Sequence, residues 1–218
     1  MITKVQLLRG AVFIAAALPA AYIALEIGRA INGLPNGLGA DPGKAVVVFI
    51  GEWALRFLLI TLAITPVRKL GLRMLARVRR MLGLYTFFYA TIHISAYFVL
   101  LLDLRWGDLL ADVVERPYIT VGAAAWLGLV PLAITSTNAW MRRLRRNWMR
   151  LHRVVYVVAV LALIHLVWIS RSDYAEALVY AVVVCVLFAA RLASAWWPKR
   201  RWDGASRPAG GAEGCTRH

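Results

Sequence analysis

Cysteine and acidic residues are scarce in this chain of 218 residues, which has two cysteines, and 11 Asp and Glu against 26 Lys and Arg. Cys185 falls inside a long apolar run and Cys215 near the C-terminus, so neither a disulfide framework nor a Cys-x-x-Cys metal site is expected. No glycine-rich phosphate loop follows a predicted strand, and no internal repeat is evident. The sequence therefore predicts no nicotinamide-binding domain.

Apolar residues dominate what is present. They make up 61% of the chain, and the mean hydropathy is +0.65, more than the core of a soluble domain of this length needs. Runs of about 20 residues match a hydrocarbon core of about 30 Å crossed as helix, and they lack the alternation of a barrel strand. We predict an all-α bundle of six transmembrane helices, at residues 10–27, 45–65, 82–102, 117–135, 152–170 and 174–195.

The distribution of charge predicts the orientation of these helices. Two connections are basic and contain no acid, whereas residues 103–116 carry four acids against two arginines. The positive-inside rule then places both basic connections and both termini in the cytoplasm. The net charge of +15 is thereby explained by topology and by lipid headgroups rather than by nucleic acid. Residues 1–197 are expected to form one membrane domain, and residues 198–218 a cytoplasmic, disordered tail.

Three of the four histidines fall within the predicted spans. At about 1.5 Å per residue, His93 lies about 16 Å along its helix from the cytoplasm and His165 about 20 Å along its own. Two imidazoles at matched depth can supply both axial ligands of a haem iron, while a proton relay and plain packing remain alternatives. His152 lies at the mouth of the same helix as His165, roughly 140° away from its face on an ideal helix. The rise suits a second cofactor stacked toward the cytoplasm, provided that the helix is distorted or that the ligands approach from different sides.

Other polar and aromatic residues admit two interpretations each. Glu52 and Arg56 share a helix face, so they form an ion pair or Arg56 binds a haem propionate. Arg79 and Arg80 could bind propionates or quinone oxygens, or anchor the helix at the cytoplasmic surface. Four aromatic side chains near His93 could wall a porphyrin or pack between helices: Tyr85, Phe88, Tyr89 and Tyr97.

Four segments resemble a known family. They read "IGEWALRFLLITLAITPVRKL", "RRMLGLYTFFYATIHISAYFVLLLD", "ERPYITVGAAAWLGLVPLAITSTNAW" and "NWMRLHRVVYVVAVLALIHLVWIS", and they cover most of residues 45–170. They resemble the MsrQ (YedZ) family, within the ferric-reductase-like transmembrane group. Its members are the haem-binding membrane subunits of periplasmic methionine sulfoxide reductase systems.

The resemblance implies a function in electron transfer. It implies that His93, His152 and His165 are associated with b-type haem, one or two per chain, and that FMN binds as well. Electrons would come from the quinone pool or a flavin reductase and leave to a molybdopterin-containing, MsrP-like reductase outside the bacterial inner membrane. A stand-alone ferric reductase and a histidine-relay proton channel remain the alternatives.

One departure from the wider group concerns the second haem. Stacking two bis-histidine haems needs two histidines on each of two helices, but the span with His93 has only that one. The position one haem further toward the cytoplasm falls at Arg79 and Arg80. The pair His93–His165 is therefore the expected haem site, and the ligand opposite His152 stays open.

The acidic connection is expected to help dock the partner reductase by long-range attraction. The alternative is that its acids only follow from the charge bias of membrane proteins. The residues concerned are Asp103, Asp108, Asp112 and Glu115.

Overall fold

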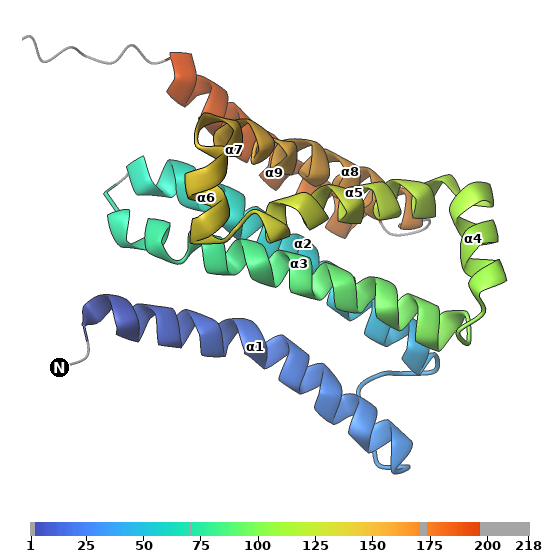
Figure 1. Cartoon of the computed structure of the whole chain (residues 1–218). Helices are drawn as coiled ribbons and strands as arrows, with labels where there is room; N and C mark the ends of the chain where they lie inside the picture. The colour runs from blue at the N-terminus through green and yellow to red at the C-terminus, as the bar shows by residue number, and fades with distance from the viewer. Residues whose placement is uncertain (1–2, 70, 171–173, 197–218) are drawn as a thin grey trace, which may run out of the picture.

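The computed structural model describes residues 3–69, 71–170 and 174–196, and every regular element in them is helical (Figure 1). The predicted tail at residues 198–218, with Cys215 and His218, lies outside the described residues. The elements are α1 (Lys4–Ile31), α2 (Pro42–Lys69), the 3-10 turn η1 (Arg73–Arg77), α3 (Arg79–Ala96), the π-helical turn η2 (Tyr97–Leu101), α4 (Trp106–Glu115), α5 (Pro117–Ile134), α6 (Asn138–Leu144), α7 (Arg146–Leu151), α8 (Val154–Ile169) and α9 (Ala175–Trp196).

Six segments of the described chain are long and apolar enough to cross a membrane. They are α1, α2, α3 with η2, α5, α7 with α8, and α9, in the order that the sequence predicts. The prediction of an all-helical bundle with six apolar helices is therefore confirmed. The shorter helices α4, α6 and α7 were not predicted, because they are brief segments at the ends of the bundle rather than long apolar runs.

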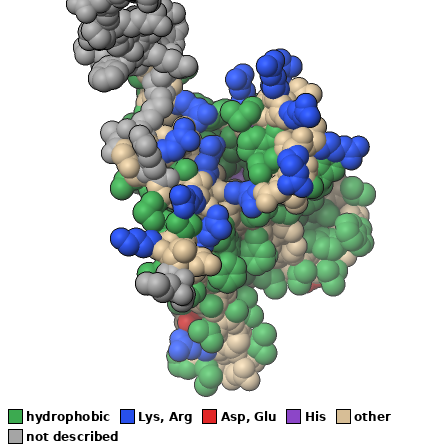
Figure 2. Space-filling view, turned by 60° about the vertical axis from the view of Figure 1, so that its left-hand side comes forward, with side chains coloured by type: hydrophobic (Ala, Val, Ile, Leu, Met, Phe, Trp, Pro, Cys, Tyr) green, Lys and Arg blue, Asp and Glu red, His purple; other side chains and the backbone are tan. Residues whose placement is uncertain are grey.

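Basic side chains gather at one end of the bundle. The end that carries η1, α6 and α7 is also the end where α1 begins and α9 finishes (Figure 1). Figure 2 shows Lys and Arg side chains spread over this end, with hydrophobic side chains along the flanks. An apolar flank and a charged end are what a lipid bilayer selects, because charge is costly in hydrocarbon.

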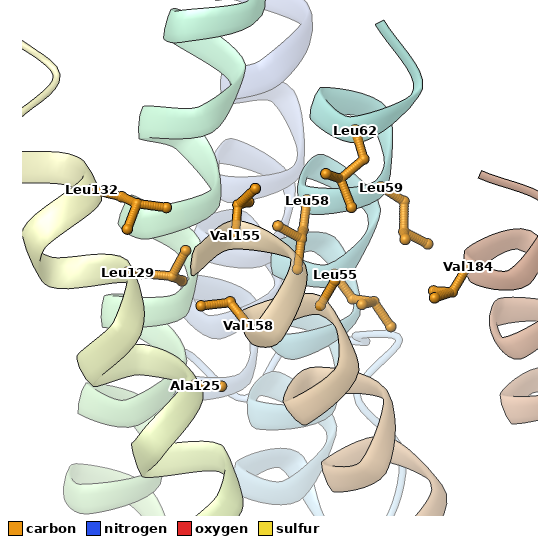
Figure 3. Packing of buried hydrophobic residues seen from close by; sticks show 11 residues of the cluster. Leu55, Leu58, Leu59, Leu62, Ala125, Leu129, Leu132, Val155, Val158 and Val184 are labelled. Atoms are coloured by element: carbon orange, nitrogen blue, oxygen red, sulfur yellow. The ribbon is translucent and has the colours of Figure 1, made fainter. Parts of the chain in front are cut away.

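Helix α2 lies at the centre of the packing. In the most apolar part of α2, 56% of the residues are buried inside the protein. The corresponding share is 22% at most for any other candidate span. One core cluster joins it to α5, α8 and α9 through leucine, valine and alanine side chains (Figure 3). A second cluster joins it to α1 and α3. Four leucines spaced three and four residues apart, and so on one face of the helix, place α2 in the first cluster: Leu55, Leu58, Leu59 and Leu62.

Helix α1 docks through a tyrosine hydroxyl. It contains Pro19, whose ring disturbs the helical hydrogen bonding around it. The buried Tyr89 of α3 donates to the carbonyl of Ala16 at 2.8 Å and accepts from the amide of Ala20 at 2.9 Å. The hydroxyl thus bridges two backbone groups one turn apart, where a side chain inserted beside a proline can bend a helix.

Replacing Tyr89 with Phe should destabilise the protein by about 1–3 kcal/mol, because it removes the partner of two buried backbone groups. Thermal unfolding of the detergent-solubilised protein measures the loss. The matched control is Tyr85→Phe, whose hydroxyl donates only to the carbonyl of Phe13 at an exposed position. Equal thermal midpoints for the two variants would contradict this account.

Candidate functional site

His93 of α3 and His165 of α8 meet inside the bundle. Their ring centroids lie 6.3 Å apart, and the ring planes are inclined at 84°. The two residues come from different helix pairs, because α3 packs along α2 and α8 packs along α5. The structure thus brings together the two histidines whose matched depths suggested a pair.

Each histidine is held by the backbone of the helix beside it. The Nδ1 atom of His93 lies 2.9 Å from the carbonyl oxygen of Val47 on α2, and Nδ1 of His165 lies 2.6 Å from that of Tyr118 on α5. A carbonyl can only accept, so Nδ1 carries the proton in both rings. The lone pair is then on Nε2, the arrangement that metal-binding histidines adopt.

A glycine lies one helical turn beyond each of these carbonyls. Gly51 faces His93 and Gly122 faces His165, and a Cβ at either position would approach the Nδ1 and Cε1 atoms of the ring to 2.7–2.8 Å. Each ring therefore lies against the backbone of its neighbouring helix. A residue larger than glycine at position 51 or 122 would leave no room for the facing imidazole ring.

The pair fits a metal whose remaining ligands come from elsewhere. Metal–nitrogen bonds of about 2 Å on both sides, with about 1 Å from nitrogen to ring centre, separate two axial imidazole centroids by about 6 Å. Among the described residues, no group of three or more His, Cys, Asp and Glu side chains is gathered as a metal site. Two opposed imidazoles suit a haem, in which the porphyrin supplies the other four nitrogens.

The arrangement of a carbonyl and a glycine around each histidine, here called the histidine clamp, occurs twice. The sequence analysis did not predict it. In each copy a carbonyl, a glycine four residues later and a histidine combine, with carbonyl and histidine separated by 46 and 47 residues. Two short repeats in the sequence accompany it. "LAIT" occurs at 62–65 and 132–135, and "ATIH" at 90–93 returns as "ALIH" at 162–165. These repeats indicate that the two helix pairs are similar, but neither repeat contains a glycine.

The aromatic residues near His93 serve helix packing. Tyr85 and Tyr89 direct their hydroxyls to α1, so they do not wall the histidine pair. On the side facing α5, Trp126 donates from its indole to the hydroxyl of Thr91 at 3.0 Å and stacks on Phe87. This contact ties α3 to α5 two residues before His93.

At the basic end, His152 lies in a break between two helices. Helix α7 ends at Leu151 and α8 begins at Val154, so His152 lies just before the helix predicted at 152–170 rather than in its first turn. The ring stacks on Trp148 with centroids 3.9 Å apart, and its Nδ1 lies 3.1 Å from the Trp148 carbonyl. Because His152 lies outside both helices, the angle of about 140° from His165 that an ideal helix would impose does not apply to it.

Arg79 and Arg80, the two arginines expected near this position, differ in burial and in their partners. Arg79 is half-buried and close enough to His152 for its charge to act on the ring. Arg80 is exposed and donates to the side chain of Asn138 at the start of α6. Only Arg79 therefore accompanies His152.

Arg56 is occupied by protein partners. Its guanidinium donates to Glu52 at 2.8 Å and to the hydroxyl of Tyr180 at 2.9 Å, and it lies 3.7 Å from Glu176. It also lies over the ring of Trp53. The geometry agrees with the ion-pair interpretation. Arg56 also connects α2 to α9 through Tyr180 and Glu176.

Two of the four acids in the acidic connection are paired with its own arginines. Asp112, 7% exposed, accepts from Tyr97 and from Arg116, whose Nε lies 2.9 Å away. Asp108 pairs with Arg105 at 3.0 Å. These residues line a polar cavity of about 390 Å³ at the end of the bundle opposite the basic one. Of the four acids proposed to attract a partner, Asp112 is not available for that role.

Comparison with known proteins defines the class first. The family described as "Ferric reductase like transmembrane component" matches residues 50–163, which include α3, α5, most of α2 and of α8, and His93, and which end two residues before His165. The chain is a multi-pass membrane protein of this ferric-reductase-like class.

The nearer relatives narrow the class. A protein of Xanthomonas euvesicatoria pv. vesicatoria is 49% identical over 193 residues, 87% of this chain and 88% of the relative. One of Xanthomonas oryzae pv. oryzae is 50% identical over 85% of each chain, and one of Ralstonia nicotianae is 44% identical over 84% of each. All three are named protein-methionine-sulfoxide reductase heme-binding subunit MsrQ. The chain belongs to the MsrQ family.

Replacing Asp112 with Asn should lower stability by about 1–3 kcal/mol, because a buried carboxylate that holds two donors is lost. Asp108→Asn is the matched control and should cost at most about 1 kcal/mol, since both partners of its ion pair are exposed. Thermal unfolding in detergent compares the two. If Asp108→Asn proves the more damaging, Asp112 does not organise this end of the bundle.

Proposed function

We propose that this chain is the b-type cytochrome subunit of a methionine sulfoxide reductase system, with His93 and His165 as the axial ligands of one haem. The observation that carries the proposal is the pair of imidazoles 6.3 Å apart, each with Nδ1 bound to a carbonyl. Bound haem would supply one-electron transfer between a donor and a partner protein. The names of the relatives support the same cofactor.

The residues around the pair explain why this site would transfer electrons. A haem held by His93 and His165 would have no position open for a substrate. The carbonyls of Val47 and Tyr118 hold the rings in the metal-binding tautomer. Because the rings are already oriented, the two residues would rearrange little when a bound metal changed its charge.

The direction of transfer follows from topology and from the partner. We place the basic end, with both termini, in the cytoplasm and the end with α4 at the periplasmic face of a bacterial inner membrane. Electrons would come from the quinone pool or a flavin reductase. They would leave to a periplasmic, molybdopterin-containing MsrP-like reductase, in keeping with relatives named as one subunit of a reductase.

A second cofactor would bind at the basic end. Arg79 beside His152 offers a cation and an imidazole, and the stack on Trp148 keeps that ring at the helix break. We propose that they bind FMN or a second haem, with Arg79 meeting the phosphate or a propionate. Arg80, which contacts Asn138, would contribute only if it changed its side-chain conformation.

The purified protein should show a low-spin b-type haem spectrum, because two imidazoles leave iron no open position. His93→Ala and His165→Ala should each lose most of this spectrum. His152→Ala should lose part of it, if a second haem binds at the basic end, or none. A colourless protein from haem-replete cells would sink the proposal, as would full spectra from the first two variants.

Reporter fusions test the orientation. A reporter joined at Asp112 should be active in the periplasm, and one joined at Arg145 should be active in the cytoplasm, because the basic end stays inside. Alkaline phosphatase and a fluorescent protein read the two sides. The reverse pattern would invert the proposed direction of electron transfer.

A further inference from the structure

The two glycines beside the histidines leave room for nothing but hydrogen. A Cβ at Gly51 would lie 2.8 Å from both Nδ1 and Cε1 of His93, and one at Gly122 would lie 2.7 Å from the same atoms of His165. Carbon atoms in contact prefer separations of about 3.5–4.0 Å. Any side chain at either position must therefore displace the ring.

The rings cannot move away freely. Each is tied by Nδ1 to a carbonyl on the same helix as its glycine, at Val47 for His93 and at Tyr118 for His165. A ring pushed outward loses that hydrogen bond, and a ring that keeps it must rotate about the bond. Carbonyl and glycine together thus define both the position of the ring and its plane.

We propose that Gly51 and Gly122 are positioning residues that set the planes of the His93 and His165 rings, and so their inclination of 84°. The proposal rests on the proposed function, in which these rings are the axial ligands of one haem. In a ferric bis-imidazole haem, perpendicular ring planes leave two iron d orbitals nearly equal in energy. The electron paramagnetic resonance (EPR) signal is then more anisotropic than with parallel planes.

Alanine at each glycine tests the proposal on the full-length purified protein. Gly51→Ala and Gly122→Ala should each lower the largest g value of the ferric low-spin signal or convert part of it to a high-spin signal. Both should also retain less haem. The physical reason is that the added methyl group forces a ring to turn or to leave the metal.

Two other glycines provide matched controls. A Cβ at Gly128 would lie 2.7 Å from Cγ2 of Val158, an equally close contact between α5 and α8 but without a histidine. Gly128→Ala should lower the thermal midpoint and keep the wild-type EPR signal. At Gly83 a Cβ would lie 3.7 Å from Thr61, an ordinary contact, so Gly83→Ala should change neither.

A rescue experiment covers the case in which an alanine variant fails to accumulate. His93→Gly removes the ring and makes room for the methyl group, and free imidazole can then replace the ligand. Adding Gly51→Ala should weaken the apparent affinity for imidazole about tenfold or more in this background. Gly128→Ala should leave this affinity unchanged in the His93→Gly background, and in the His165→Gly background Gly122→Ala should weaken the affinity for imidazole to a similar extent.

The outcomes separate the two proposals. A wild-type protein without haem, or one whose spectrum survives His93→Ala, would overturn the proposed function. A wild-type low-spin spectrum that His93→Ala abolishes, combined with unaltered EPR signals and imidazole affinities in the glycine variants, would overturn only the positioning role.

Discussion

The hydrogen bond from a histidine Nδ1 to a carbonyl of the neighbouring helix is the interaction on which the centre of the bundle depends. Inside hydrocarbon an imidazole N–H must find an acceptor, and almost every polar backbone group is already engaged in its own helix. A carbonyl oxygen has a second lone pair, so it can accept from a side chain without giving up its helical bond. The neighbouring helix must then approach closely, and a glycine one turn further on permits this.

The same need to satisfy polar groups explains the remaining contacts between helices. Tyr89 bridges two backbone groups of α1 beside Pro19, and Trp126 donates to Thr91 between α5 and α3. Arg56 joins α2 to α9 through Glu52, Tyr180 and Glu176. Leucine and valine side chains fill the space between these contacts, but in lipid they do not by themselves distinguish one helix partner from another.

Features that depend on local sequence could be predicted, and features that depend on contacts between distant segments could not. The apolar runs predicted the six long helices, and a constant rise per residue predicted that His93 and His165 lie at similar depth. The break at His152 was not predicted, because nothing between Leu151 and Val154 is a strong helix breaker. The burial of Asp112 was also missed, since charge counting treats every acid in a connection as exposed. Both clamping glycines looked like ordinary glycines until the facing helices were known.

The repeated clamp has a consequence for how the protein is assembled. Each histidine is oriented entirely within one antiparallel hairpin, α2 with α3 or α5 with α8, and needs nothing from the other hairpin. Membrane helices inserted in pairs can therefore present a finished half-site as soon as each pair has formed. A haem bound between His93 and His165 would then bridge two helix pairs whose histidines are already oriented, in addition to the apolar cluster that α2 shares with α5 and α8.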